Sequence, residues 1–274
     1  MKYLLYSFVI KRISGGRNMD FKNDVQKQFG KSADSYVSST IHKDGKDLVK
    51  LREMASIIGE EKLLDVATGG GHTANAFAQY VKMVTAVDLT PEMLGAAEKF
   101  IKGNGHRNVD FVQGDAENLP FPNEGFDIVT CRIAPHHFPN VKKFVEEVHR
   151  VLMPNGQFLL DDNVVPEEDD FDLFYNTIEK WRDYSHYRAW KKSEWLRMLE
   201  MSDFEIYEWH RFDKTFRFDP WCNRMNLPQD EKEKLAEYMK GASQKIKNKF
   251  KIIMESDKII SFQGEAIVIK AIKR

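Results

Sequence analysis

Residues Leu63 to Thr73 are Leu-Leu-Asp-Val-Ala-Thr-Gly-Gly-Gly-His-Thr, and this segment is the clearest indicator of the fold class. It begins as a short apolar run, which predicts a buried strand, and it continues into a helical pattern. The glycines between them allow a tight turn and let a ligand approach the backbone closely. Because the start of a helix also offers unpaired amide donors, the stretch predicts a nucleotide site. The spacing Gly69-x-Gly71-x-x-Ala74 satisfies the dinucleotide fingerprint as well, so a nicotinamide cofactor stays open at this point.

Short apolar runs alternate with helical patterns on both sides of this turn. Strands are predicted at Lys62–Ala67, Met83–Asp88, Val109–Val112, Phe126–Cys131, Gln157–Asp161, Phe204–Arg211 and Ala266–Ile272. A turn is predicted at Pro154-Asn155-Gly156, just before the fifth of these strands. This order predicts an α/β fold with a doubly wound, Rossmann-like and mostly parallel sheet of seven strands, covered by helices on both faces.

The same patterns divide the chain into four regions. Residues 1–18 form an extension whose order the sequence does not determine, and residues 19–58 predict lid helices. Residues 59–163 predict the nucleotide-binding α/β core, and residues 164–274 predict cap helices together with the last two strands. A Lys-rich helical insertion at 228–256 separates those two strands, so we expect a helical cap built from the N-terminus and this late insertion.

The composition is that of an ordinary globular protein, with 42% hydrophobic residues and a net charge of −1. That charge does not indicate nucleic acid as a partner. The apolar run at 4–10 is too short to span a bilayer, and no other segment is long enough. Cys131 and Cys222 are far apart and show no metal-ligand spacing, so we expect no metal and a cytoplasmic setting. The sequence leaves a monomer and a dimer equally open.

Asp65 lies at the end of the first predicted strand, directly before the glycine turn. A carboxylate there would repel a pyrophosphate and attract the ammonium group of a methionine moiety, because no Arg or Lys in the turn offsets it. The alternative is that Asp65 staples the loop through hydrogen bonds. Both roles are compatible.

Asp88 ends the second predicted strand, about 20 residues after the glycines. A carboxylate at this position can accept hydrogen bonds from both hydroxyls of a ribose. A helix N-cap is the competing role, but Thr90 followed by Pro91 suits that role better.

Asp115 follows the third predicted strand within Gln-Gly-Asp-Ala-Glu-Asn-Leu-Pro. Its carboxylate could accept from an adenine amine, while the Ala116 amide could donate to a ring nitrogen. Leu89 and Met93 could flank the ring with apolar surface. An ordinary polar loop is the alternative, but three nucleotide-type features in strand order favour a ligand.

With these motifs in view, residues from about 62 to 163 resemble the class I S-adenosylmethionine-dependent methyltransferases. The resemblance is strongest to the ubiquinone/menaquinone-biosynthesis-type branch, methyltransferase type 11. It rests on LLDVATGGGHT, TAVDLTPEML, FVQGDAENLPFPNEGFDIVTCRIAPHHFPN and VLMPNGQFLLDDN, and the earlier FGKSADSYVSS resembles the lid segment of that branch. These motifs are specific for the fold and the cofactor and weak for the substrate.

The resemblance implies S-adenosylmethionine bound across the carboxyl ends of the strands, and a final antiparallel hairpin. By matching position, the methionine part would lie against Asp65, Ala67, Thr68, Gly69 and Gly71. The nucleoside and the cofactor floor would be held by Asp88, Leu89, Met93, Asp115, Ala116, Arg132 and Ile133, with Tyr36 closing over from the lid. Ala67 departs from the glycine that many members have, and we expect little effect from the added methyl group.

Catalytic residues are less evident than cofactor residues. His136 and His137 follow the fourth strand and could deprotonate an acceptor, since histidine titrates near neutrality. Packing under the loop is the competing role for either ring. A mixed aromatic and basic cluster would suit a planar, anionic acceptor, and it comprises Trp181, Tyr184, His186, Tyr187 and Arg188. Alternatively, these aromatic side chains pack in the core of the cap and the polar ones form its rim, which explains the cluster equally well.

The sequence therefore predicts a methyltransferase that transfers a methyl group from S-adenosylmethionine directly to a small-molecule acceptor. A nicotinamide-dependent oxidoreductase is one alternative, supported by the glycine spacing. A macromolecule methyltransferase acting on RNA or protein is the other, supported by the Lys-rich insertion.

Overall fold

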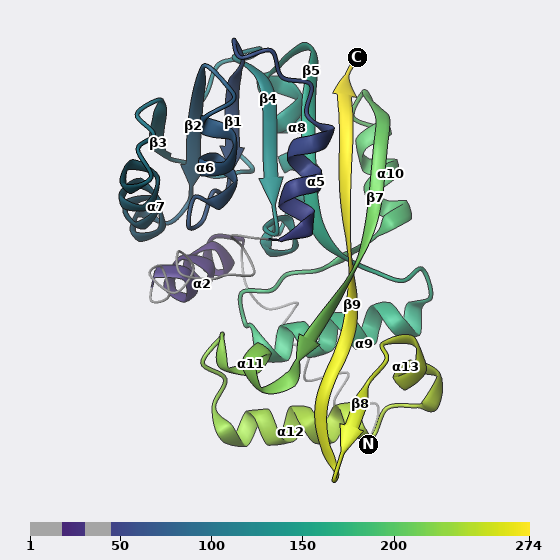
Figure 1. Ribbon diagram of the computed structural model, residues 1–274. Helices are drawn as coiled ribbons and strands as arrows, with labels where there is room; N and C mark the ends of the chain where they lie inside the picture. Colours follow the sequence, from purple (N-terminus) through teal and green to yellow (C-terminus); the bar gives the residue numbers. More distant parts are fainter. Residues whose placement is uncertain (1–17, 31–44) are drawn as a thin grey trace.

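The structure, a computed structural model, describes residues 18–30 and 45–274 (Figure 1). Its centre is a mixed sheet of nine strands, seven of which follow the order β3-β2-β1-β4-β5-β9-β7. The strands are β1 Lys62–Val66, β2 Met83–Asp88, β3 Val109–Gln113, β4 Phe126–Arg132, β5 Leu152–Val165, β6 Trp190–Lys191, β7 Phe204–Arg217, β8 Ile253–Glu255 and β9 Lys258–Lys273. Neighbours from β3 to β5 are parallel, whereas β9 runs antiparallel to β5 and β7. The doubly wound, mostly parallel sheet is confirmed, and the short strands β6 and β8 are two additions to the predicted seven.

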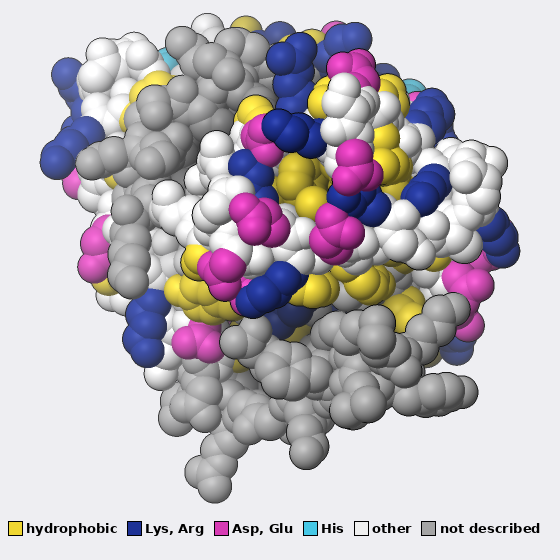
Figure 2. Space-filling model, turned by 90° about the horizontal axis from the view of Figure 1, so that it is seen from below, with side chains coloured by type: hydrophobic (Ala, Val, Ile, Leu, Met, Phe, Trp, Pro, Cys, Tyr) yellow, Lys and Arg dark blue, Asp and Glu magenta, His cyan; other side chains and the backbone are white. Residues whose placement is uncertain are grey.

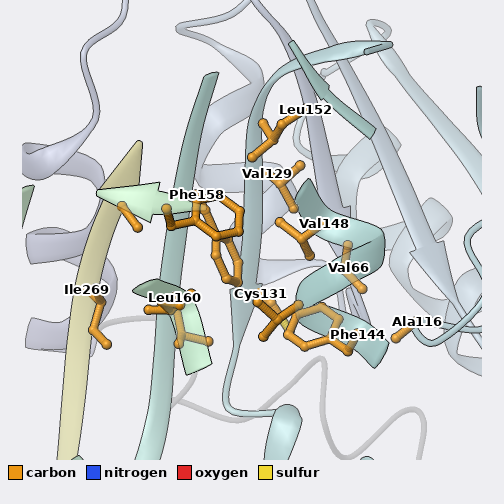
Figure 3. Close-up of a cluster of buried hydrophobic side chains, with 14 of the residues drawn as sticks. Val66, Ala116, Val129, Cys131, Phe144, Val148, Leu152, Phe158, Leu160 and Ile269 are labelled. Carbon is orange, nitrogen blue, oxygen red and sulfur yellow. The ribbon is translucent and has the colours of Figure 1, made fainter. Parts of the chain in front are cut away.

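Helices cover both faces of the sheet because successive residues of a strand point to opposite sides. All helices of the described residues, those of the sheet faces and those beyond them, are α2 Asn18–Gly30, α5 Lys46–Met54, α6 His72–Ala78, α7 Pro91–Gly103, the 3₁₀ turn η1 Pro135–His137, α8 Val141–Val151, α9 Asp169–Arg182, α10 Lys192–Glu200, α11 Phe218–Asn223, α12 Gln229–Lys240 and α13 Gln244–Lys249. Leu63 of β1 joins a buried cluster with α6 and α7, while Leu64 joins the cluster under α8 and α10. Figure 3 shows the second cluster, with Phe144 and Val148 lying against β4. Each such buried side chain contributes roughly 1.5–3 kcal/mol.

Helix α8 illustrates how local sequence builds these layers. Its buried apolar residues recur at helical spacing: Val141, Phe144, Val145, Val148 and Val151. The helix begins where the side chain of Asn140 accepts a hydrogen bond from the Lys143 amide at 3.1 Å.

Strand β5 begins earlier than predicted. Phe126 of β4 pairs with Leu152, and the next pair joins Ile128 to Gln157, so residues 153–156 bulge out of the ladder. The predicted turn at 154–156 therefore lies inside the bounds of β5 as a bulge. Asn155 adopts a φ of 62° there, a conformation that asparagine tolerates better than most residues.

Strands β7 and β9 are longer than predicted and connect the core to a second layer, the cap (Figure 1). The cap comprises α9, the segment 183–189 that follows it, α11, α12 and α13, and its buried centre is aromatic. Trp221, Tyr175, Phe250 and Phe262 pack in this centre. The segment between β7 and β9 thus forms most of the cap. This agrees with the predicted late insertion that contributes to a helical cap.

The described residues of the predicted lid region lie in two settings. Helix α5 packs against β5, β9 and α6, within the helical layer on one face of the sheet. Helix α2 contacts α7 and lies between the core and the cap (Figure 1).

Candidate cofactor site

A pocket opens at the carboxyl ends of the parallel strands, where ligands bind in doubly wound sheets. Of the predicted cofactor residues, eleven line it: Asp65, Ala67, Thr68, Gly69, Asp88, Leu89, Met93, Asp115, Ala116, Arg132 and Ile133. Tyr36 lies outside the described residues. Residues that were predicted from three separate strand ends therefore meet in one pocket.

Gly71 does not line the pocket. Its role is in the packing of α6 against α7. It precedes α6 as the N-cap with a φ of 81°. A Cβ atom there would lie 2.9 Å from Ile101 Cδ1 and 3.0 Å from Ala97 Cβ, so only glycine lets α6 approach α7 this closely.

Two non-glycine residues of the pocket have left-handed backbone conformations. Ala67 follows β1 with a φ of 53°, and Ile133 follows β4 with a φ of 54°. A β-branched residue in this region is a genuine outlier, and such strain of about 1–3 kcal/mol concentrates at ligand sites. The methyl group of Ala67 thus introduces strain that the sequence comparison with glycine did not anticipate.

Asp65 is buried and staples the turn. Its carboxylate accepts from the hydroxyls of Thr68 at 2.6 Å and Thr130 at 2.7 Å, and from the Ala74 amide at 3.2 Å. Burial raises the pKa of Asp65 to about 6, although these hydrogen bonds oppose the rise. The stapling role is therefore present, and Asp65 also borders the pocket.

Asp88 holds the two backbone segments that flank the pocket. Its Oδ2 atom accepts from the Gly69 amide and its Oδ1 atom from the Thr90 amide, both at 2.9 Å. Burial raises the pKa of Asp88. Each carboxylate oxygen can accept a second hydrogen bond, so the group retains capacity for ligand hydroxyls.

Asp115 is joined to α2 by an ion pair. Lys22 Nζ lies 2.6 Å from Asp115 Oδ2 and 2.6 Å from Glu117 Oε2. Gln26 of α2 also donates to the Leu89 carbonyl oxygen at 2.8 Å. Helix α2 is thereby attached to two of the loops that carry predicted adenine contacts.

Arg132 is fixed from behind the pocket. Its guanidinium contacts Asp47 Oδ2 at 2.7 Å and Asp161 Oδ2 at 3.3 Å. Burial, with Asp47 as an acidic neighbour, raises the pKa of Asp161 to about 8. The pKa of Asp47 is lowered: burial opposes this, but its hydrogen bond with Asp161 and the charge of Arg132 prevail. A single buried negative charge thus balances Arg132.

His137 lines the pocket, whereas His136 lies behind it and pairs with Asp162 of β5. The predicted substrate cluster does not enter the pocket among the described residues. Trp181 donates to Glu231 in the cap, and Arg188 pairs with Asp172. Tyr184 and Tyr187 are partly exposed at the surface. The ring of His186 lies 5.6 Å from that of His136. The backbone amides of Tyr187 and Arg188 donate to the His136 carbonyl oxygen at 2.8 and 2.9 Å, so these two residues meet the catalytic candidates through their backbone.

Sequence reasoning missed the contribution of α2. Lys22, Val25 and Phe29 line the pocket from this helix. Their spacing of three and four residues places them on one helical face, which is a recognisable pattern. No pattern within α2 itself indicates that this face borders a pocket whose other lining residues lie between 65 and 139.

The charges that line the pocket suit a cationic nucleoside. Asp65, Asp88, Asp115 and Glu117 all border it. Its lysine and arginine, Lys22 and Arg132, are both held by carboxylates, which leaves neither suited to a diphosphate. Among residues 18–30 and 45–274, no group of three or more potential ligands could hold a metal ion.

Comparisons with known proteins agree with this geometry. Residues 64–160 match the methyltransferase domain family. The chain is 38% identical over 247 residues to the uncharacterized methyltransferase YcgJ of Bacillus subtilis, covering 90% of this chain and 98% of that protein. A solved structure of a candidate methyltransferase from Bacillus halodurans C-125 has 56% identity and a TM-score of 0.82, covering 84% and 99% of the two chains.

A ubiquinone/menaquinone biosynthesis C-methyltransferase, UbiE of Rickettsia bellii, is 32% identical over 192 residues, which are 64% of this chain and 75% of that protein. These relatives decide between the two cofactors that the glycine spacing left open. The chain belongs to the S-adenosylmethionine-dependent methyltransferases of the type 11 branch.

Proposed function

We propose that this methyltransferase acts on a small-molecule acceptor. The observation that carries the proposal is that α2 crosses the pocket and is held on both sides. Lys22 binds the core at Asp115, and Phe21 packs edge-on against Tyr187 of the cap with ring centroids 5.4 Å apart. A macromolecule would need an open face where this helix lies.

The chain's own residues supply positioning and a dry environment. When bound, S-adenosylmethionine supplies an activated methyl group on a sulfonium sulfur. Phe29, Ile133 and Phe138 present apolar surface at the β4 side of the pocket, where an acceptor would exclude water. Holding two reactants in line can contribute roughly 7–11 kcal/mol of barrier reduction.

The Lys-rich insertion argues against a nucleic-acid substrate. Lys232, Lys234, Lys240, Lys245 and Lys249 each pair with a carboxylate. Figure 2 shows basic and acidic side chains interspersed over the cap end of the molecule. Neutralised lysines contribute little to the counterion release that drives nucleic-acid binding.

The experiment is a methyl-donor turnover screen over phenols, quinols, amines and carboxylates, with RNA as a separate arm at low salt. Quinols come first because a relative is named for ubiquinone and menaquinone biosynthesis. Turnover of one small molecule with no RNA binding supports the proposal. Methylation of RNA or protein alone would replace it. Among the described residues no helix has the length and apolar character to cross a membrane. Cytoplasmic location and oligomeric state stay predictions.

Affinity for S-adenosylhomocysteine is expected to rise with pH, if the carboxylate of Asp65 attracts the ligand ammonium group. The pKa of Asp65 is raised to about 6 by burial, so the carboxyl is neutral below this value and charged above it. The ligand ammonium stays charged over this range, so binding should be roughly tenfold weaker at pH 5 than at pH 7. Calorimetry across this range measures the change. Asp65→Asn is the control, and a pH dependence that persists in this variant would remove Asp65 from the role.

A further inference from the structure

Three buried histidines gather where η1 meets the cap. The rings of His136 and His137 lie 4.2 Å apart, and that of His186 approaches both from the segment after α9. All three are at most 9% exposed. His137 lines the cofactor pocket together with Phe138 and Pro139, so its ring is the one that an acceptor can reach.

The cap determines which nitrogen of His137 carries the proton. Nδ1 lies 2.8 Å from the backbone carbonyl oxygen of Ser185, which can only accept a hydrogen bond. The Ser185 hydroxyl donates to Asp183 at 2.5 Å, so its oxygen also presents lone pairs toward Nδ1. Nδ1 is therefore the protonated nitrogen. In the neutral ring Nε2 then carries a lone pair, and no described residue donates a hydrogen bond to it.

The ring of His136, one residue earlier, has an acidic partner instead of a carbonyl oxygen. Its Nδ1 lies 2.5 Å from Asp162 Oδ1. Burial lowers the pKa of His136, but the charge of Asp162 and this hydrogen bond outweigh it, so the pKa is raised. Burial and the neighbouring His136 charge lower the pKa of His137 to about 3. His136 thus holds a proton more readily than His137 does, and the His137 ring is the neutral acceptor at the pocket wall.

We propose that Nε2 of His137 receives the proton of the methyl acceptor, and that the cap positions the ring through the Ser185 carbonyl. This inference rests on the proposed function. The acceptor atom forms its bond to the methyl carbon with its own lone pair. The methyl–sulfur bond breaks, and its electron pair stays on sulfur. The acceptor's proton passes to Nε2 and then to water. The substrate class is therefore one with an O–H or S–H bond at the methylated atom, because a methylated amine would keep its proton against so weak a base.

A weakly basic imidazole is sufficient for this step, because the proton of a hydroxyl or thiol becomes strongly acidic as the bond to the methyl carbon forms. The groups that face His137 are His136 of η1, Arg182 at the end of α9, and Asp183 and His186 after it. Helix α2 contributes the apolar ring of Phe29, 5.0 Å away. A protonated His136 would drive the received proton on to solvent, since two cations at this distance repel.

The first test needs no acceptor. Long-range nitrogen-15 correlation spectra of the full chain, labelled at histidine, report the tautomer of each ring. At pH 7, with and without S-adenosylhomocysteine, we expect His137 to be neutral with its proton on Nδ1. The spectrum of His137→Asn lacks the His137 signals, so comparison with the wild-type spectrum assigns them. A proton on Nε2, or a doubly protonated ring at pH 7, would overturn the inference while leaving the proposed function intact.

Asp162→Asn tests the positioning role of the His136 pair. Loss of the carboxylate should lower the pKa of His136, so His136 carries less positive charge and the pKa of His137 should rise above its wild-type value. A purely structural pair would leave the His137 titration unchanged, and that outcome would remove His136 and Asp162 from the proposal.

The second test uses the first acceptor found in the turnover screen. His137→Asn retains a donor toward Ser185 but lacks a base at Nε2, so turnover should fall by about 10²–10⁴-fold. Affinity for S-adenosylhomocysteine should be unchanged. His106→Asn, at the opposite end of the sheet before β3, is the matched control and should keep wild-type turnover. Wild-type turnover by His137→Asn would overturn the inference, whereas failure of the wild type to bind S-adenosylhomocysteine would count against the proposed function itself.

Discussion

Asp88→Ala is expected to weaken S-adenosylhomocysteine binding by at least about 100-fold. The carboxylate accepts from the amides of Gly69 and Thr90 at 2.9 Å, and it thereby holds the glycine turn against the start of α7. Hydrogen bonds to charged groups contribute about 1.5–3 kcal/mol each, and the variant removes the two that the carboxylate can accept from the ribose hydroxyls. Loss of those two bonds corresponds to about two or more factors of ten in affinity, and loss of the bonds to Gly69 and Thr90 also loosens the turn that borders the ligand.

Calorimetry with S-adenosylhomocysteine measures this loss. Asp110→Ala is the matched control, because Asp110 lies exposed on the neighbouring strand β3 and should leave binding unchanged. Equal affinity of Asp88→Ala and wild type would remove Asp88 from the cofactor site. A lower affinity accompanied by unfolding would be recognised by circular dichroism.

Gly71→Ala is expected to destabilise the fold by about 2–4 kcal/mol. A side chain at a φ of 81° introduces strain of roughly 1–2 kcal/mol. The new Cβ would also lie 2.9 Å from Ile101 and 3.0 Å from Ala97, and overpacking of this kind costs about 1–3 kcal/mol. Alanine also reduces the conformational freedom of the unfolded chain. This effect stabilises the protein by about 0.4–1 kcal/mol and offsets part of the destabilisation.

Urea denaturation of the two proteins measures the difference. Gly95→Ala is the control, since Gly95 lies in α7 and a Cβ atom there would meet nothing within 4 Å. That variant should be more stable than wild type by about 1 kcal/mol, because alanine is the better helix former. A Gly71→Ala protein as stable as wild type would show that α6 and α7 can move apart without loss of folding stability.

The cofactor side of the pocket could be predicted from sequence because its residues follow strands directly. Asp65, Asp88 and Asp115 each lie at or just after the end of a short apolar run. In a parallel sheet these ends meet at one edge, so the order of the runs along the chain is enough to place the side chains together. The glycine turn was equally visible, although the packing role of Gly71 against α7 was not.

The acceptor side could not be predicted in the same way. The aromatic and basic cluster at 181–188 is compatible with a binding surface, yet among the described residues its members pair or pack outside the pocket. A local pattern shows which residue types are close in sequence. It does not show which side of the cap faces the core.

The α/β class, the glycine turn and the strand-end carboxylates could be read from the sequence, because hydrophobic period and turn chemistry are properties of short segments. The surroundings of the proposed acceptor site follow from tertiary packing instead. His136 meets Asp162 across 26 residues, and the His137 ring meets the Ser185 carbonyl across 48. Helix α2 reaches Asp115 across 93 residues. Such contacts depend on how whole layers pack, and no local periodicity encodes them.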